Sequence, residues 1–252
     1  FSANPSVLPL LGRARELSLL SDHRYNPALG QLRELWHINS AQPRPPSIRH
    51  IADALREAPT MDAVEIDGIR VRSKNRAVRV DFDQLVQGYA VDRELALLRE
   101  RGIPHARLRV GQVTGALGSD GPGGWWLALP ASFAKRGLPD RLALHDGERA
   151  CLLTPEQGFS YQQHQYHRHL DARTGWPAAG IDSVIVIHAR GDTAAVACAA
   201  LLVAGPRDWP AVAARLGVRE VLLQTGTGQF EATSALRTRL PAAAAITVRT
   251  LP

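Results

Sequence analysis

The stretch Ser183–Pro206, S-V-I-V-I-H-A-R-G-D-T-A-A-V-A-C-A-A-L-L-V-A-G-P, carries the clearest structural signal in the chain. Residues 183–188 form a nearly continuous apolar run of strand length, which predicts a buried strand. Thr193–Ala204 is rich in alanine and is closed by Gly205 and Pro206, which predicts a helix and its end. We interpret Cys198, inside that helix, as a small buried thiol.

The rest of the chain alternates between two periodicities. Spacing of three to four between apolar residues predicts helices at Pro5–Leu20, Ala28–Ile38, Ile48–Glu57 with Ser47 as its cap, Tyr89–Arg101 and Trp209–Leu216. Period-two or short apolar runs predict strands at 63–66, 69–72, 77–81, 107–117, 125–129 and 220–224, with weaker ones at Phe230 and Ile246–Val248. Strands and helices interleave without regular βαβ spacing, so we expect a single α+β domain over residues 1–252.

Composition excludes several classes of protein. The 252 residues are 45% hydrophobic and 21% charged, which is ordinary globular usage. No run approaches the ~18 apolar residues of a membrane-spanning helix. Only two of the 30 Lys and Arg residues are lysines, and the arginines are scattered rather than gathered in a block. A nucleic-acid surface gathers its basic residues on one face, so nucleic acid is not the expected partner.

The motifs of several common enzyme classes are absent from the sequence. There is no P-loop, no Rossmann glycine fingerprint before a helix and no G-x-S-x-G elbow. His167 and His169 would share a face of a strand, which leaves a metal pair open. Asp171 is the only carboxylate near them, so a solvated face or an anion contact is favoured over a metal pair.

Three segments together resemble a known family. They are N-P-A-L-G-Q-L-R-E-L-W (Asn26–Trp36), Q-G-Y-A-V-D (Gln87–Asp92) and H-L-D-A-R-T-G-W-P (His169–Pro177). In this order and spacing they resemble the FAD:protein FMN transferases, the ApbE-like flavin transferases. That family shows F-D-P-x-x-G-x-L-x-x-L-W, L-G-G-x-x-K-G-Y-x-x-D, H-x-x-D-P-x-T-G-x-P and a D-A-x-x-T helix. The resemblance covers about Phe1–Gly226.

The resemblance implies a fold and an activity. The fold is a flavin-transferase α+β domain with mixed, mainly antiparallel sheets and packed helices, whose N-terminal strand would lie upstream of Phe1. The activity is cleavage of the FAD diphosphate with Mg²⁺, which places FMN on a Thr or Ser of an acceptor protein. The expected location is periplasmic or associated with the inner membrane.

The resemblance also implies positions for the flavin. Those expected near it are Tyr25, Asn26, Asp81 and Gln87. The residues themselves suggest a further hypothesis: the basic cluster of Arg168, His169 and Arg173 is expected to offset phosphate charge in place of a metal.

The sequence departs from the family motifs at positions that bind the metal in the family. Counted back from Gly205 without a gap, the family's metal-binding Asp and Thr read Ala195 and Ala199, whose methyl groups bind no Mg²⁺. Asp192 lies one turn upstream and is a candidate displaced ligand, and Gln84 offers an amide oxygen in place of the second motif glycine.

Other motif positions differ too. Gln87 replaces the motif lysine, and Arg168 stands where the family has its His. Three hypotheses follow: a transferase with an altered metal shell, a metal-free flavin-binding protein, and a partner subunit that binds no flavin.

Overall fold

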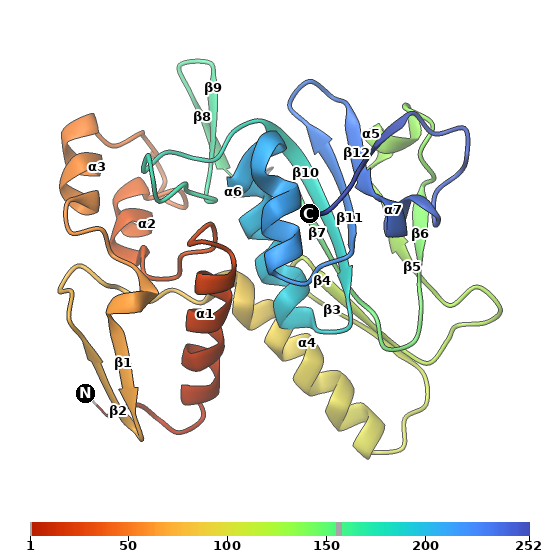
Figure 1. Ribbon diagram of the computed structural model, residues 1–252, viewed down its shortest axis with the longest axis horizontal. Coiled ribbons are helices and arrows are strands. Elements are labelled where there is room, and N and C mark those ends of the chain that lie inside the picture. The colour runs from red at the N-terminus through yellow and green to blue at the C-terminus, as the bar shows by residue number, and fades with distance from the viewer. Residues whose placement is uncertain (1, 155–157) are drawn as a thin grey trace.

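The computed structural model describes residues 2–154 and 158–252, and its centre is a seven-stranded sheet (Figure 1). Neighbouring strands pair antiparallel, except β12 and β13, which are parallel. In spatial order the strands are β13 (Ile246–Arg249), β12 (Phe230–Thr233), β11 (Glu220–Thr225), β10 (Ile181–His188), β7 (Arg149–Leu153), β4 (Val113–Leu117) and β3 (Ala106–Val110). The expected α+β class with mainly antiparallel pairing is confirmed.

Helices and small ribbons surround this sheet. The helices are α1 (Leu8–Leu20), α2 (Gly30–Trp36), α3 (Ile48–Leu55), α4 (Asp83–Glu100), α5 (Ala131–Ala134), α6 (Gly191–Arg215) and α7 (Ser234–Arg237), with a 3-10 turn at Met61–Ala63. Two-stranded ribbons pair β1 (Val64–Asp67) with β2 (Arg70–Ser73), β5 (Trp125–Ala128) with β6 (Arg141–Leu144), and β8 (Gly158–Tyr161) with β9 (His164–His167). Among the described residues, no helix is both long and apolar enough to cross a membrane.

Strand β10 shows why the sheet is buried on both faces. Val184 and Val186 belong to the core cluster that contains α6, α4 and α1, whereas Ile185 and Ile187 belong to the cluster under β5, β6, α5 and α7. Successive side chains of a strand point to opposite faces, so a continuous apolar run is what a doubly covered strand requires. The prediction of a buried strand is confirmed.

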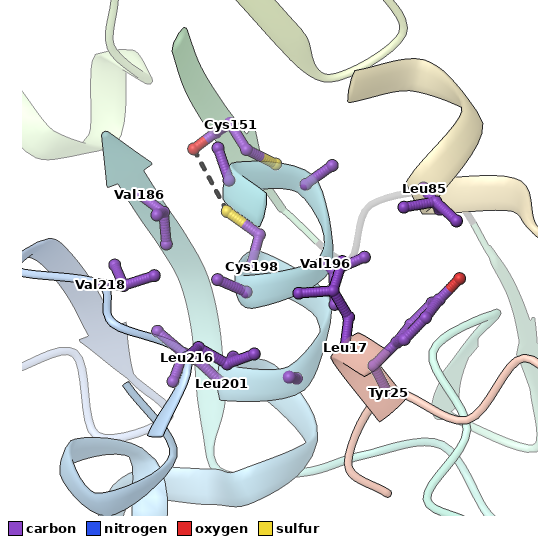
Figure 2. Close-up of a cluster of buried hydrophobic side chains, with 14 of the residues drawn as sticks. Leu17, Tyr25, Leu85, Cys151, Val186, Val196, Cys198, Leu201, Leu216 and Val218 are labelled. Atoms are coloured by element: carbon purple, nitrogen blue, oxygen red, sulfur yellow. Dashed lines mark hydrogen bonds between the residues drawn. The ribbon is translucent and has the colours of Figure 1, made fainter. Parts of the chain in front are cut away.

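Helix α6 fills the first of these clusters. Residues 191–205 are all buried, and Figure 2 shows Cys198 pointing toward β7, where its Sγ lies 3.2 Å from the carbonyl oxygen of Cys151. Val196 points the other way, toward Leu17 and Tyr25 (Figure 2). The predicted break at Gly205 is confirmed, since its φ of 76° and ψ of 176° interrupt the helix.

Helices α4 and α6 touch through their backbones. A Cβ on Gly88 would lie 2.0 Å from the carbonyl oxygen of Gly191, so only glycine fits there. Asp92, one turn further along α4, accepts hydrogen bonds from the amides of Gly191 (2.8 Å) and Asp192 (3.3 Å). Asp92 thereby satisfies the first free N–H groups of α6 and places a negative charge at its positive end.

Three sequence-based expectations were wrong in detail. Helix α4 begins at Asp83 rather than Tyr89, because the Asp81 carboxylate accepts from the amide of Asp83 (3.0 Å) and starts the helix early. The expected strand at 77–81 is reduced to one bridge, between Arg79 and Leu29. The expected strand at 107–117 is a hairpin, since Gly111 turns the chain with a φ of 56°.

The β8–β9 hairpin stands out from the body of the protein (Figure 1). Its tip residues Gln162 and Gln163 both have positive φ, as a tight two-residue hairpin turn requires. Near its base, Tyr166 stacks on Phe159 at 5.2 Å and lies 5.6 Å from Trp36. An aromatic cluster therefore attaches the hairpin to α2.

Gly88→Ala tests the α4–α6 contact. We expect the free energy of unfolding to fall by about 3 kcal/mol or more, because the new Cβ meets backbone that cannot swing away. The matched control is Gly12→Ala in α1, where a Cβ meets nothing within 4 Å. That change should raise the free energy of unfolding by about 0.5–1 kcal/mol. Urea unfolding of the two variants measures both effects, and equal stabilities would contradict the tight contact.

Candidate functional site

A cavity of about 550 Å³ opens between the start of α2, the start of α4 and the segment before β10. Its volume lies within the range of small-molecule and cofactor sites. Its lining includes Arg33, Glu34, Arg79, Asp81 and Arg168. The first motif segment and the extended segment 79–82, far apart in sequence, thus form two walls of one cavity.

Main-chain hydrogen bonds align these walls. The amide of Arg79 donates to the carbonyl of Ala28 (3.2 Å), and the amide of Gly30 donates to the carbonyl of Arg79 (2.8 Å). A Cβ on Gly30 would lie 2.6 Å from that same Arg79 oxygen, so the motif glycine lets the extended segment lie against α2. The pairing leaves the side chains of Arg79 and Asp81 at the cavity.

Two carboxylates hold two guanidinium groups at the cavity. Arg33 Nη1 lies 2.9 Å from Asp81 Oδ2 and 3.6 Å from Asp83 Oδ2, and Arg168 Nη2 pairs with the same Asp83 oxygen. Charge-assisted pairs of this kind fix the direction of the guanidinium plane. The expectation placed Asp81 and Arg168 in one site, and the structure brings them together.

The third motif shapes the turn after Arg168. Asp171 accepts from the backbone amide of Arg173 and pairs with its guanidinium, with Nη2–Oδ2 at 2.7 Å. The Trp36 indole donates to the carbonyl of Gly175 at 2.9 Å, which joins this turn to α2. Arg173 is therefore held by Asp171 and is not among the residues that line the cavity.

His169 is buried, and this changes its expected role. Burial, followed by the nearby His167, Arg33 and Arg168, lowers the pKa of His169 to about 3. The imidazole is therefore neutral near pH 7 and cannot offset phosphate charge. Burial likewise lowers the pKa of His167, whose Nε2 lies 2.9 Å from the carbonyl oxygen of Ala178.

Three other residues expected near the flavin do not line the cavity: two make hydrogen bonds within the protein, and the third is buried. Asn26 is 5% exposed, donates to the carbonyl of Pro59 (2.9 Å) and accepts from the amide of Ala28 (3.1 Å). Gln87 Oε1 accepts from the amide of Gln112 at 3.0 Å and so supports the β3–β4 turn. Tyr25 is buried, which raises its pKa, and its hydroxyl has no hydrogen-bond partner among the described residues.

Asp192, the expected displaced metal ligand, is fully engaged by cations of the protein. Arg190 binds both of its oxygens (Nε–Oδ1 3.1 Å, Nη2–Oδ2 2.5 Å), and Arg13 does the same (Nη2–Oδ1 3.3 Å, Nε–Oδ2 3.1 Å). Burial raises the pKa of Asp192, but hydrogen bonds from Arg190, Arg13 and Thr193 outweigh it, so the pKa is lowered well below its usual range. Asp192 is only 2% exposed, and its charge is already compensated.

The Mg²⁺ implied by the resemblance does not fit the residues present. Ala195 and Ala199 are buried methyl groups, and Gln84 Oε1 is the one unpartnered oxygen that the expected ligand set still offers in the described chain. Mg²⁺ requires near-octahedral oxygen coordination, usually with at least one carboxylate. No group of three or more His, Cys, Asp or Glu side chains suited to a metal occurs within residues 2–154 and 158–252.

Sequence reasoning missed four arginines. Arg79 alternates with Asp81 in the extended segment, so its period-two spacing was a usable signal. Arg33 lies at a variable position inside the first motif, where nothing marks it. Arg13 and Arg190 reach Asp192 from positions 179 residues before it and two residues before it, and only the fold reveals the pair.

His169 gives the stability a pH dependence. The unfolded chain takes up a proton near pH 6.5, whereas the folded chain resists it down to about pH 3. The free energy of unfolding contributed by His169 is therefore complete above pH 6.5 and is lost as the pH falls toward 3. Between pH 7.5 and 5.0 the wild type should lose about 2 kcal/mol more than His169→Gln. Urea unfolding at both pH values measures this, and parallel losses would contradict a buried neutral imidazole.

Asp192→Asn should lower the free energy of unfolding by about 2–3 kcal/mol, because it leaves two guanidinium groups beside a neutral amide. Asp120→Asn, on an exposed loop, is the control and should change stability little. Thermal and urea unfolding compare the two variants. A stable Asp192→Asn variant would show that the two arginines do not depend on this carboxylate.

The sequence is similar to known proteins over its whole length. The sequence model of the ApbE family matches residues 1–223. A FAD:protein FMN transferase of Rhodobacter capsulatus is 35% identical over 263 residues, which cover 100% of this chain and 50% of that protein. One of Klebsiella pneumoniae (strain 342) is 26% identical over 184 residues, covering 72% of this chain and 57% of that protein. The chain therefore spans about half the length of these relatives.

Solved structures show the same fold. The ApbE protein of Thermotoga maritima superposes with a TM-score of 0.83 at 23% identity, over 95% of this chain and 79% of that one. The Pseudomonas stutzeri flavinyl transferase ApbE in its apo form gives 0.81 at 24% identity, over 97% and 78%. With the sequence match over most of its length and the shared fold, the chain belongs to the ApbE family.

Proposed function

We propose that this chain binds FAD in the arginine-lined cavity and transfers FMN to a Thr or Ser hydroxyl of an acceptor protein. The observation that carries the proposal is the cavity itself, built from the first motif segment and the segment 79–82 and lined by Arg33, Arg79 and Arg168. The relatives named as FAD:protein FMN transferases support it. By the same resemblance we propose a periplasmic or inner-membrane-associated location.

The proposed reaction is a phosphoryl-type transfer. The acceptor hydroxyl oxygen attacks the phosphorus on the FMN side of the diphosphate, and the bond from that phosphorus to the bridging oxygen breaks. FMN becomes esterified to the acceptor, AMP leaves, and the hydroxyl proton is released to AMP or solvent. Positive groups must offset the charge on the phosphate oxygens for the attack to proceed. Arg33 and Arg168, held in direction by Asp81 and Asp83, are suited to this task.

A second candidate function is flavin binding without transfer. It is favoured by the loss of metal ligands at Ala195 and Ala199 and by the arginine pair that encloses Asp192. Such a protein would hold FAD or act beside another subunit. The two candidates differ in whether AMP is released.

Incubation with FAD and a peptide library containing a single Thr or Ser tests the transfer. We expect chromatography to detect released AMP. We also expect a fluorescent peptide whose mass has increased by that of one covalently attached FMN group. Arg168→Ala should lower the rate about 100-fold, because it removes a donor to the developing charge. Arg72→Ala, on exposed β2 away from the cavity, should not. FAD binding without AMP or adduct, with or without Mg²⁺, would reject the transfer and leave the binding protein.

A further inference from the structure

The cavity contains guanidinium donors that the protein does not use. Arg33 makes its ion pairs through Nη1 and Arg168 through Nη2. Each guanidinium carries five N–H donors in a planar fork, so several donors of each have no partner among the described residues. The carboxylates therefore orient these two side chains without saturating them.

Arg79 is the cation of the cavity with the least compensated charge. Its Nη1 donates only to the carbonyls of Arg76 and Val78, both at 3.2 Å, and no carboxylate in the described part of the chain pairs with it. Glu34 also lines the cavity; like Arg79 it is exposed, and it forms no ion pair with a described residue. Arg79 therefore offers the cavity a positive charge that no described carboxylate pairs with.

The place expected to hold a cation lies next to this cavity and is closed to one. Gln84 lies one helical turn before Gly88, and Ala195 lies one turn after Gly191, where α4 and α6 touch. Because the two helices run in opposite directions (Figure 1), both residues lie on the same side of the contact. Gln84 is 2% exposed and Ala195 is fully buried. A metal site here would need a carboxylate, whereas these two positions offer only an amide and a methyl group.

We propose that this chain binds the phosphates of a flavin nucleotide through guanidinium groups and without a divalent cation, with Arg79 as a direct phosphate contact. The inference rests on the proposed function for the identity of the ligand. It differs from the family expectation in the source of positive charge: Arg33, Arg79 and Arg168 supply it. Asp192, the carboxylate of the expected ligand set, is bound by Arg13 and Arg190 and so already has its charge compensated.

FAD titration followed by flavin fluorescence tests the metal independence. The protein is freed of metal, and the titration is made with EDTA and again with excess Mg²⁺. We expect dissociation constants that agree within about twofold. Binding that appears only with Mg²⁺ would overturn the inference and leave the proposed function standing. Absence of binding under both conditions would overturn the inference and the proposed function together.

Arg79→Ala tests the contact. It should weaken FAD binding about tenfold or more, since it removes a charge-assisted hydrogen bond, and it should leave riboflavin, which has no phosphate, unchanged. The matched control is Arg76→Ala, an exposed arginine of the same loop that does not line the cavity. Equal FAD affinities of the two variants, or an equal loss for riboflavin and FAD in Arg79→Ala, would overturn Arg79 as a phosphate contact.

Binding of Mn²⁺ gives a readout that does not involve flavin. Electron paramagnetic resonance of the wild type should show no tightly bound Mn²⁺ in the absence of nucleotide. One tight Mn²⁺ per chain that is lost in Asp192→Asn would show that the α6 carboxylate still binds a metal. That result would overturn the inference whatever the affinity for FAD.

Discussion

The structure depends on the hydrogen bonds that the Asp92 carboxylate of α4 accepts at the start of α6. It accepts the first amides of α6 and also pairs with Arg149 of β7 at 2.7 Å, so one side chain connects α4, α6 and the central sheet. The connection is possible only because Gly88 and Gly191 allow the two helix backbones to touch. The Asp81 carboxylate accepts from the first amide of α4, and Asp83, the first residue of α4, pairs with the cavity arginines. A shift of α4 against α6 would therefore move one wall of the cavity. The site is thus positioned by a contact between helices about two turns away from it.

Much of the fold was predictable because its signals are local. The apolar run at 183–188 and the alanine-rich helix after it follow from periodicity, and Ser47 caps its helix as expected, accepting from the amide of His50 at 3.2 Å. The site was only partly predictable. Asp81 and Arg168 lie at the cavity, but the burial that neutralises His169 and the two arginines that enclose Asp192 depend on residues brought together by the fold. Local sequence carries no record of such contacts, nor of Gln87 supporting a turn instead of facing a ligand.

The charge pattern of the site is self-consistent. Asp192, beside the alanines at the expected metal positions, is compensated by Arg13 and Arg190, whereas the arginines that line the cavity, where we propose the phosphates bind, are incompletely compensated. Arginine suits both tasks because it stays charged when partly buried and binds two oxygens at once. An exchange of metal for guanidinium keeps the sign of the field but changes its shape, from one compact point charge to several planar forks with fixed directions.

The β8–β9 hairpin has a practical consequence. Its base is anchored by aromatic packing of Phe159 and Tyr166 near Trp36, whereas its tip at Gln162 and Gln163 forms a two-residue turn away from the body of the protein. Exposed loop tips of this kind accept inserted residues with little loss of stability. A fluorophore or an affinity peptide placed there would report on the molecule or immobilise it, and the arginine-lined cavity would stay accessible because none of its lining residues belongs to the hairpin.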